Sequence, residues 1–202
     1  MDFKKHLETA WNMTLKFIVP LVILTLVMLA VSVVTLGILA PVALAGYTQS
    51  LLLLMRTGKE PRVQDLFSQM RLFLPLLFFG IVTFIAVLIG LFLMVLPGIL
   101  VALGVLFCCF YMIPLMTDRG LGLMDAIKES YAMAMSGNKQ DHVVAVIIFI
   151  AITAVGGSIA IGSLFTQPLA TLFFLSFYEE KSAGFGKRSP DEKSSPIGTR
   201  ES

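Results

Sequence analysis

The sequence predicts an all-α fold: a polytopic membrane helical bundle of about six transmembrane helices, arranged as three hairpins. Two observations lead to this prediction. Of the 202 residues, 57% are apolar and 14% are charged, whereas soluble domains carry about 45–50% apolar and about 25% charged residues. The charged residues are also confined to short stretches between three long uncharged runs. This composition excludes a soluble globular domain, a disordered chain and a disulfide scaffold.

The three uncharged runs cover residues 17–55, 72–117 and 142–178. One crossing of the hydrocarbon core takes about 20 residues, so each run is long enough for about two crossings. Two helices joined by a turn are expected in each run, because a helix satisfies its own backbone hydrogen bonds in lipid. The first and third runs are the shorter ones, which leaves open whether one limb of either hairpin turns back before it crosses.

Each run contains glycine or proline near its middle, where these residues favour a reversal of the chain. In the middle run they separate two full-length limbs, 72–95 and 99–117. The expected hairpin turns are at Gly37 and Pro41, at Pro97-Gly98, and at Gly156-Gly157.

Basic residues mark the cytoplasmic side of the predicted bundle. All 15 Lys and Arg residues lie before residue 17, within 56–71, within 119–139 or after residue 180. Three hairpins place these four segments on one face of the membrane, and the positive-inside rule makes that face cytoplasmic. Both termini are therefore expected in the cytoplasm, with residues 1–180 as the membrane domain. Residues 181–202 are polar and contain several Pro and Gly, which predicts a disordered cytoplasmic tail.

A short amphipathic stretch precedes each hairpin, at residues 2–15, 61–73 and 122–135. Its apolar residues recur at helical spacing with polar residues opposite, which is typical of a helix lying in the headgroup plane. We therefore expect a cytoplasmic interfacial helix before every hairpin, so that one structural unit occurs three times. An Asp near the start of each stretch is explained by the helix dipole without a catalytic role.

The most polar side chains within the uncharged runs are two glutamines with neighbouring hydroxyl groups. Gln49 follows Thr48 in the first run, and Gln167 follows Thr166 in the third. These residues either cross-link helices by hydrogen bonds, or they line a polar pathway or hold a lipid headgroup, and the sequence leaves both interpretations open. His142 begins the third run and is interpreted as an interfacial residue rather than a proton or metal site.

The uncharged runs predict no catalytic, cofactor-binding or metal-ligating residues, and no cofactor. They contain no acidic or basic side chain, which disfavours ion-coupled transport and proton relays. Two histidines in the whole chain are too few for a convincing zinc centre. In the first cytoplasmic loop, Arg56, Lys59 and Arg62 are predicted to contact anionic lipids, which attract each Lys or Arg by about 1 kcal/mol.

Several short motifs are shared with a set of bacterial membrane families. They are Leu96-Pro97-Gly98, Asp118-Arg119-Gly120, Asp125-Ala126 with Ser130, Gly162 with Thr166-Gln167-Pro168-Leu169, and Tyr178. Over residues 10–180 the chain resembles uncharacterised domains related to the membrane domain of glycerophosphoryl diester phosphodiesterase. The resemblance implies a six-helix bacterial inner-membrane fold and no chemistry, because the phosphodiesterase active site belongs to a separate soluble domain. The sequence departs from the family's pattern at Asn138-Lys139, where an aromatic residue is expected.

Together these features predict a non-enzymatic integral membrane protein of the cell inner membrane. We expect a scaffold or accessory factor that interacts with membrane lipids, with partner proteins or with itself; the near-balance of charge excludes nucleic acid. The alternative is a small permease or channel-like transporter for a neutral or lipidic solute, with Gln49 and Gln167 lining its path. A lipid-handling enzyme ranks third, because His142 would be its sole candidate base.

Overall fold

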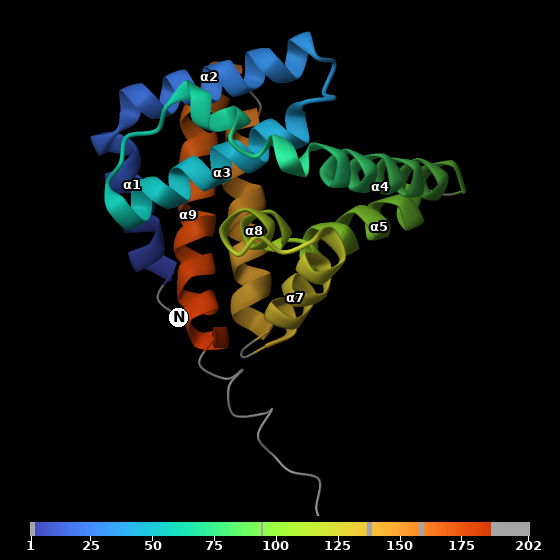
Figure 1. Cartoon of the computed structure of the whole chain (residues 1–202). Helices are drawn as coiled ribbons and strands as arrows, with labels where there is room; N and C mark the ends of the chain where they lie inside the picture. The colour runs from blue at the N-terminus through green and yellow to red at the C-terminus, as the bar shows by residue number, and fades with distance from the viewer. Residues whose placement is uncertain (1–2, 94, 137–138, 158–159, 187–202) are drawn as a thin grey trace, which may run out of the picture.

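The computed structural model describes residues 3–93, 95–136, 139–157 and 160–186, and helices dominate these segments (Figure 1). The predicted all-α class is confirmed for this part of the chain. The helices do not form one parallel bundle: α4 and α5 project as an arm to one side of the body, and α8 and α9 run across the direction of α2 and α3 (Figure 1).

The first hairpin turns where the sequence predicts. Helix α1 (Phe3–Lys16) meets α2 (Ile18–Val34) at an angle of 90°, and α3 (Ala40–Thr57) returns along α2. The turn contains Leu36 with φ of 51° and Gly37 with φ of 82°. Glycine adopts this left-handed backbone conformation without steric cost, which explains why the reversal occurs at Gly37.

The predicted amphipathic helix at 61–73 is instead two short 3₁₀ helices, η1 (Val63–Phe67) and η2 (Met70–Leu72). Close packing against α3 accounts for the difference. A Cβ atom on Gly46 would lie 2.2 Å from the carbonyl oxygen of Leu66, whose side chain is fully buried. The Asp65 carboxylate holds the turn by accepting hydrogen bonds from the backbone N–H of Arg62 (3.0 Å) and from Ser50 Oγ (3.3 Å).

The middle hairpin reverses earlier than the sequence predicts. Helix α4 (Phe73–Leu93) ends and α5 (Val95–Cys108) begins before Pro97-Gly98 is reached. Pro97 lies in the first turn of α5, where its missing N–H has no helical partner to lose. Gly98 allows the two limbs to approach closely, because a Cβ atom added to Gly90 would lie 2.7 Å from the Cα atom of Gly98.

The sequence predicts that the second limb of this hairpin is one helix over residues 99–117, but the structure divides it in two. Helix α5 ends at Cys108, and α6 (Met112–Asp118) follows after a break at residues 109–111. The break itself contains no glycine or proline, but Pro114 in the first turn of α6 has no N–H to donate to the carbonyl of Phe110, which interrupts the helix at this point.

The last part of the chain forms the third hairpin. Helix α7 (Leu123–Met135) meets α8 at an angle of 111°, and α8 (Lys139–Gly157) ends at the predicted turn. Helix α9 (Ala160–Gly186) continues beyond the predicted end of the membrane domain at residue 180. The predicted disordered tail therefore begins as helix, and residues 187–202 lie outside the described residues.

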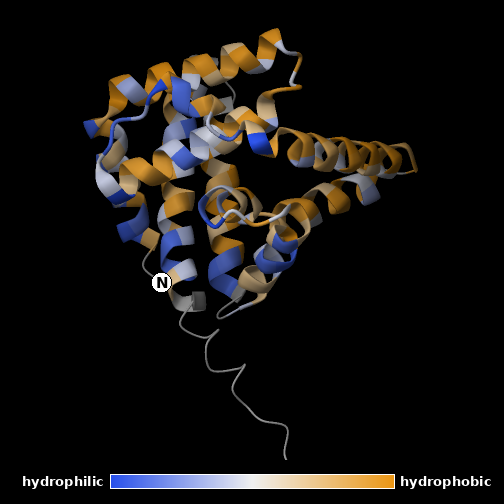
Figure 2. Cartoon of the chain, in the orientation of Figure 1, coloured by the Kyte–Doolittle hydropathy of each residue, from blue (hydrophilic) through white to orange (hydrophobic). Residues whose placement is uncertain are grey.

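Two stretches of the described residues are long and apolar enough to cross a membrane: Val63–Leu93 and Val95–Asp118. The number rises to four if the bent pairs α1–α2 and α7–α8 each form one span. This agrees with a membrane protein, while six crossings remain a prediction. Figure 2 shows the arm as hydrophobic along its length, with hydrophilic residues along the middle of α7 and at the lower ends of α8 and α9.

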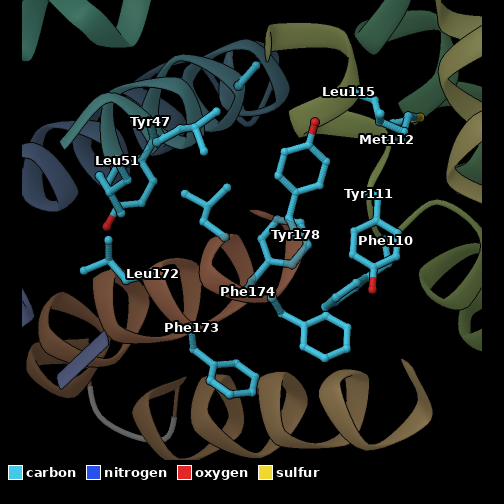
Figure 3. Close-up of a cluster of buried hydrophobic side chains, with 14 of the residues drawn as sticks. Tyr47, Leu51, Phe110, Tyr111, Met112, Leu115, Leu172, Phe173, Phe174 and Tyr178 are labelled. Carbon is cyan, nitrogen blue, oxygen red and sulfur yellow. The ribbon is translucent and has the colours of Figure 1, made fainter. Parts of the chain in front are cut away.

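The core lies where α3 and α9 meet, and it is rich in aromatic rings (Figure 3). Tyr47 of α3 is fully buried, and its hydroxyl pairs with Thr25 of α2 at 3.0 Å. Helix α1 is tied to α9 through His6, whose Nδ1 lies 2.7 Å from Ser176 Oγ and whose Nε2 lies 2.6 Å from Glu180 Oε2. One face of the amphipathic helix α1 therefore packs against α9.

Candidate functional site: a cavity at a broken helix

Ser130 of α7 satisfies the backbone groups that the break between α5 and α6 leaves without helical partners. Its Oγ donates to the carbonyl of Cys108 (2.7 Å) and accepts from the N–H of Tyr111 (3.1 Å). Ser130 is fully buried. Unpaired backbone groups are costly away from water, so this one hydroxyl stabilises the interruption inside the protein.

His142 of α8 also supports the break. Its Nε2 lies 3.1 Å from the carbonyl of Phe107, and its Nδ1 lies 3.1 Å from the Tyr111 hydroxyl. A carbonyl oxygen can only accept, so Nε2 carries the proton and Nδ1 accepts from Tyr111. The ring is fully buried, with the rings of Phe107 and Phe110 against it. His142 therefore does not face the membrane interface as the sequence suggested, and both ring nitrogens are engaged.

The break borders a half-open apolar cavity of about 280 Å³ that is lined by residues of α3, α4, α5, α6, α8 and α9. Cys109 and Ile113 line it at the break, and aromatic side chains such as Phe149 and Phe174 form further walls. Its polar lining consists of Thr48, Gln167 and Thr171 together with the thiol of Cys109. None of the described lining residues is charged, so the cavity suits a neutral, largely apolar molecule.

A second hollow of about 220 Å³ lies between α2, α3 and α9. Met28, Ser32 and Ser163 are among its lining residues. Leu44 and Gln167 line both hollows. These two side chains therefore stand between the two spaces.

The structure brings together only two of the four polar residues that the sequence singled out. Thr48 and Gln167 line the cavity, while Gln49 and Thr166 do not. Gln49 Oε1 is buried without a hydrogen-bond partner. Thr166 fills the space beside Gly156, where an added Cβ would lie 1.5 Å from its Oγ1, and thus serves the packing of α8 on α9.

The predicted helix cross-links through glutamine are not seen in the described residues. The side-chain amide of Gln167 has no hydrogen-bond partner there, although it borders both hollows. The Thr48 hydroxyl donates to the carbonyl of Leu44 in its own helix (2.8 Å). Hydrogen-bonding capacity therefore remains at the cavity wall for a bound molecule.

Arg56 joins three helices at their polar ends. Its guanidinium pairs with both carboxylate oxygens of Asp118 in α6 and donates from Nε to Glu179 of α9 (2.8 Å). The Tyr178 hydroxyl also donates to Asp118 (3.2 Å). Hydrogen bonding to Asp118, reinforced by Glu179, raises the pKa of Arg56 above its ordinary value against the opposing effect of partial burial.

The three basic residues predicted to contact lipid thus differ in their surroundings. Arg56 is committed to two carboxylates. Lys59 and Arg62 have exposed side chains, and neither forms an ion pair within the described part of the chain. Of the three, Lys59 and Arg62 are therefore the residues whose charge is available to an anionic headgroup.

Two further contacts, which the sequence analysis missed, hold the end of α9. Lys181 Nζ donates to the carbonyls of Met133 (2.7 Å) and Ser136 (3.2 Å) and so caps the C-terminus of α7. Burial lowers the pKa of Lys181. Arg119 pairs with Glu129 and donates to Ser182 Oγ (2.6 Å). These contacts explain why α9 continues past residue 180.

Comparison with protein-family models, with curated proteins and with solved structures finds no match to this chain. The resemblance to the membrane domain of the phosphodiesterase therefore stays a prediction.

Proposed function

We propose that the chain is a non-enzymatic integral protein of the bacterial inner membrane that binds a lipid as a scaffold or accessory factor. The observation that carries the proposal is the uncharged cavity at the break between α5 and α6. Irregular backbone at membrane depth occurs where it is buried in protein or lines a cavity. Here Ser130 and His142 satisfy the break on its protein side, and Cys109 lines the cavity at the same position.

The proposed topology has three hairpins, with both termini in the cytoplasm. The pairs α2–α3 and α4–α5 with α6 supply four of its limbs, and α8–α9, which run across the direction of α2 and α3 (Figure 1), supply the other two at a different tilt. The hairpin tips expose apolar side chains, of which Leu36 is 91% and Phe92 is 95% exposed. The ion pairs of Arg56 and Arg119 lie at the opposite ends of these helices, where we place the cytoplasmic face.

The surroundings of His142 support a non-enzymatic role. It was the sole candidate base for a lipid-handling enzyme, and its two nitrogens are engaged by the Phe107 carbonyl and the Tyr111 hydroxyl. A general base must lie within hydrogen-bond reach of the proton that it removes, and the buried His142 lines neither hollow. His142 instead positions the break that borders the cavity.

Native mass spectrometry of protein released gently from its own membrane tests the proposal. The Ile113→Phe variant narrows the cavity, whereas Ile89→Phe makes the same change on the exposed surface of the arm. We expect wild type and Ile89→Phe to retain lipid and Ile113→Phe to lose it. Equal retention by both variants, or a wild-type protein without lipid, would contradict lipid binding in the cavity.

A small permease for a neutral or lipidic solute is the second candidate, favoured by the second hollow. The two hollows adjoin at Leu44 and Gln167, as expected of a path with a narrow point. A permease predicts solute flux through liposomes containing the protein, and Leu44→Trp should block that flux. A protein that retains lipid and shows no flux is the accessory factor.

A further inference from the structure

We infer that the two hollows form one binding site for a neutral lipid whose two apolar chains join at a polar centre, as in diacylglycerol. The inference rests on the proposed lipid binding and specifies the class of lipid. Its basis is the placement of Gln167 at the border of two hollows, a larger apolar one and a smaller one that Ser32 and Ser163 also line.

The shape of the site favours two chains over one. The larger compartment is walled by α3 to α6, α8 and α9, and the smaller one by α2, α3 and α9. Because both border Leu44 and Gln167, a ligand that occupies both has its middle at these side chains. The compartments hold the centre of the ligand and the first part of each chain, and the remainder of each chain leaves through their open sides. A single-chain lipid with a terminal polar group would occupy one compartment and leave the other empty.

The hydrogen-bonding groups of the site match a glycerol centre with ester links. The Gln167 amide offers two N–H donors and one carbonyl acceptor, and none is used within the described part of the chain. Its donors suit ester carbonyls, and its acceptor suits a free hydroxyl. The hydroxyl groups of Thr48 and Thr171 donate to carbonyls of their own helices, so each retains lone pairs that can accept from a ligand hydroxyl.

The charge of the site favours a neutral lipid over a phospholipid. Neither hollow has an Asp, Glu, Lys, Arg or His among its described lining residues. A phosphate group placed there would lose its hydration without gaining a counter-charge. The basic residues Lys59 and Arg62 belong to the loop before η1 and line neither hollow.

A competition experiment on the full-length protein in detergent micelles tests this inference. Dioleoylglycerol, oleyl alcohol and dioleoyl phosphatidylglycerol are offered at equal concentration, and native mass spectrometry counts the bound molecules of each. We expect dioleoylglycerol to be retained in preference to both competitors. Equal or greater retention of oleyl alcohol or of phosphatidylglycerol would overturn the inference, while absence of all three would overturn the proposed lipid binding as well.

Two variants locate the preference in the site. Gln167→Leu removes the polar centre and should weaken dioleoylglycerol binding by about fivefold to tenfold, the effect of one or two neutral hydrogen bonds. Gln49→Leu is the matched control, because Gln49 lines neither hollow, and its binding should equal that of wild type. Ser32→Leu fills the smaller compartment and should remove the preference for two chains over one. Unchanged preference in both Gln167→Leu and Ser32→Leu would refute the two-compartment site.

Discussion

The arm formed by α4 and α5 and the core formed around α3 and α9 are both apolar in sequence but differ in burial. Most arm side chains are exposed on the protein surface, whereas the core buries its side chains against other helices. In the arm, Leu76, Gly90 and Gly98 are the buried residues among those described, and the limbs approach through the two glycines. In the core, Tyr47 is completely buried and hydrogen bonded. Hydropathy alone therefore marks the arm as long and apolar enough to cross a membrane, while the polar residues of less apolar helices mark the segment that lines the cavity.

Two glycines provide the strongest test of this contrast. An added Cβ on Gly46 in the core would lie 2.2 Å from a backbone oxygen, whereas one on Gly80 in the arm has nothing within 4 Å. We expect Gly46→Ala to lower the free energy of unfolding by about 3 kcal/mol, because backbone cannot move aside as a side chain can. Gly80→Ala should leave stability unchanged or raise it by up to about 1 kcal/mol. Thermal unfolding in detergent, followed by circular dichroism, measures both, and equal shifts would contradict the contrast.

Ser130→Ala tests whether the helix break depends on one hydroxyl. The variant leaves the Cys108 carbonyl and the Tyr111 N–H unpaired in a buried place, which should cost about 1–3 kcal/mol of unfolding free energy. Thr153→Ala is the matched control, because the Thr153 hydroxyl only donates to a carbonyl of its own helix. Its effect should stay within about 0.5 kcal/mol. Similar losses in the two variants would mean that Ser130 has no special role at the break.

The parts of the fold that the sequence predicted are those with local causes. Gly37 reverses the chain because its own backbone tolerates positive φ, and the middle uncharged run marks by its composition two stretches that are apolar enough to cross a membrane. Pro97 was interpreted as a turn residue, although proline is equally suited to the first turn of the helix in which it lies. Local patterns of this kind allow more than one placement within a few residues.

The candidate site could be predicted only in part, because its causes are distant in the chain. Polarity alone singled out Gln167 and Thr48, and both line the cavity. Pro114 is a local signal for the break, whereas the partners that satisfy it, Ser130 and His142, follow the residues that they contact by 19 and 35 positions. The same packing explains why Gln49, an equally polar residue, lies outside the cavity on α3.

Removing the charge of Arg56 should lower the free energy of unfolding by less than Gly46→Ala or Ser130→Ala does. Arg56 is 39% exposed, so solvent screens much of its attraction to Asp118 and Glu179. We expect Arg56→Gln to lower the free energy of unfolding by about 1 kcal/mol, mainly because the less exposed Asp118 loses its counter-charge. Lys4→Gln removes a far more exposed pair with Glu8 and should leave stability unchanged. A loss in Lys4→Gln as large as that in Arg56→Gln would show that overall charge, not this network, is responsible.

The loop before η1 offers a test of lipid binding by charge, which differs from the apolar contacts of the arm. Its exposed residues Lys59 and Arg62 are proposed to bind anionic headgroups. In nanodiscs containing phosphatidylglycerol and phosphatidylcholine, Lys59→Gln and Arg62→Gln should each reduce the phosphatidylglycerol that stays bound by about fivefold. Raising the salt concentration should produce the same loss in wild type, because exposed charges are screened. Glu60→Gln in the same loop removes a negative charge and should preserve or increase phosphatidylglycerol binding. Equal loss of phosphatidylglycerol in all three variants would contradict binding by charge and would mean that the conformation of the loop binds the headgroup.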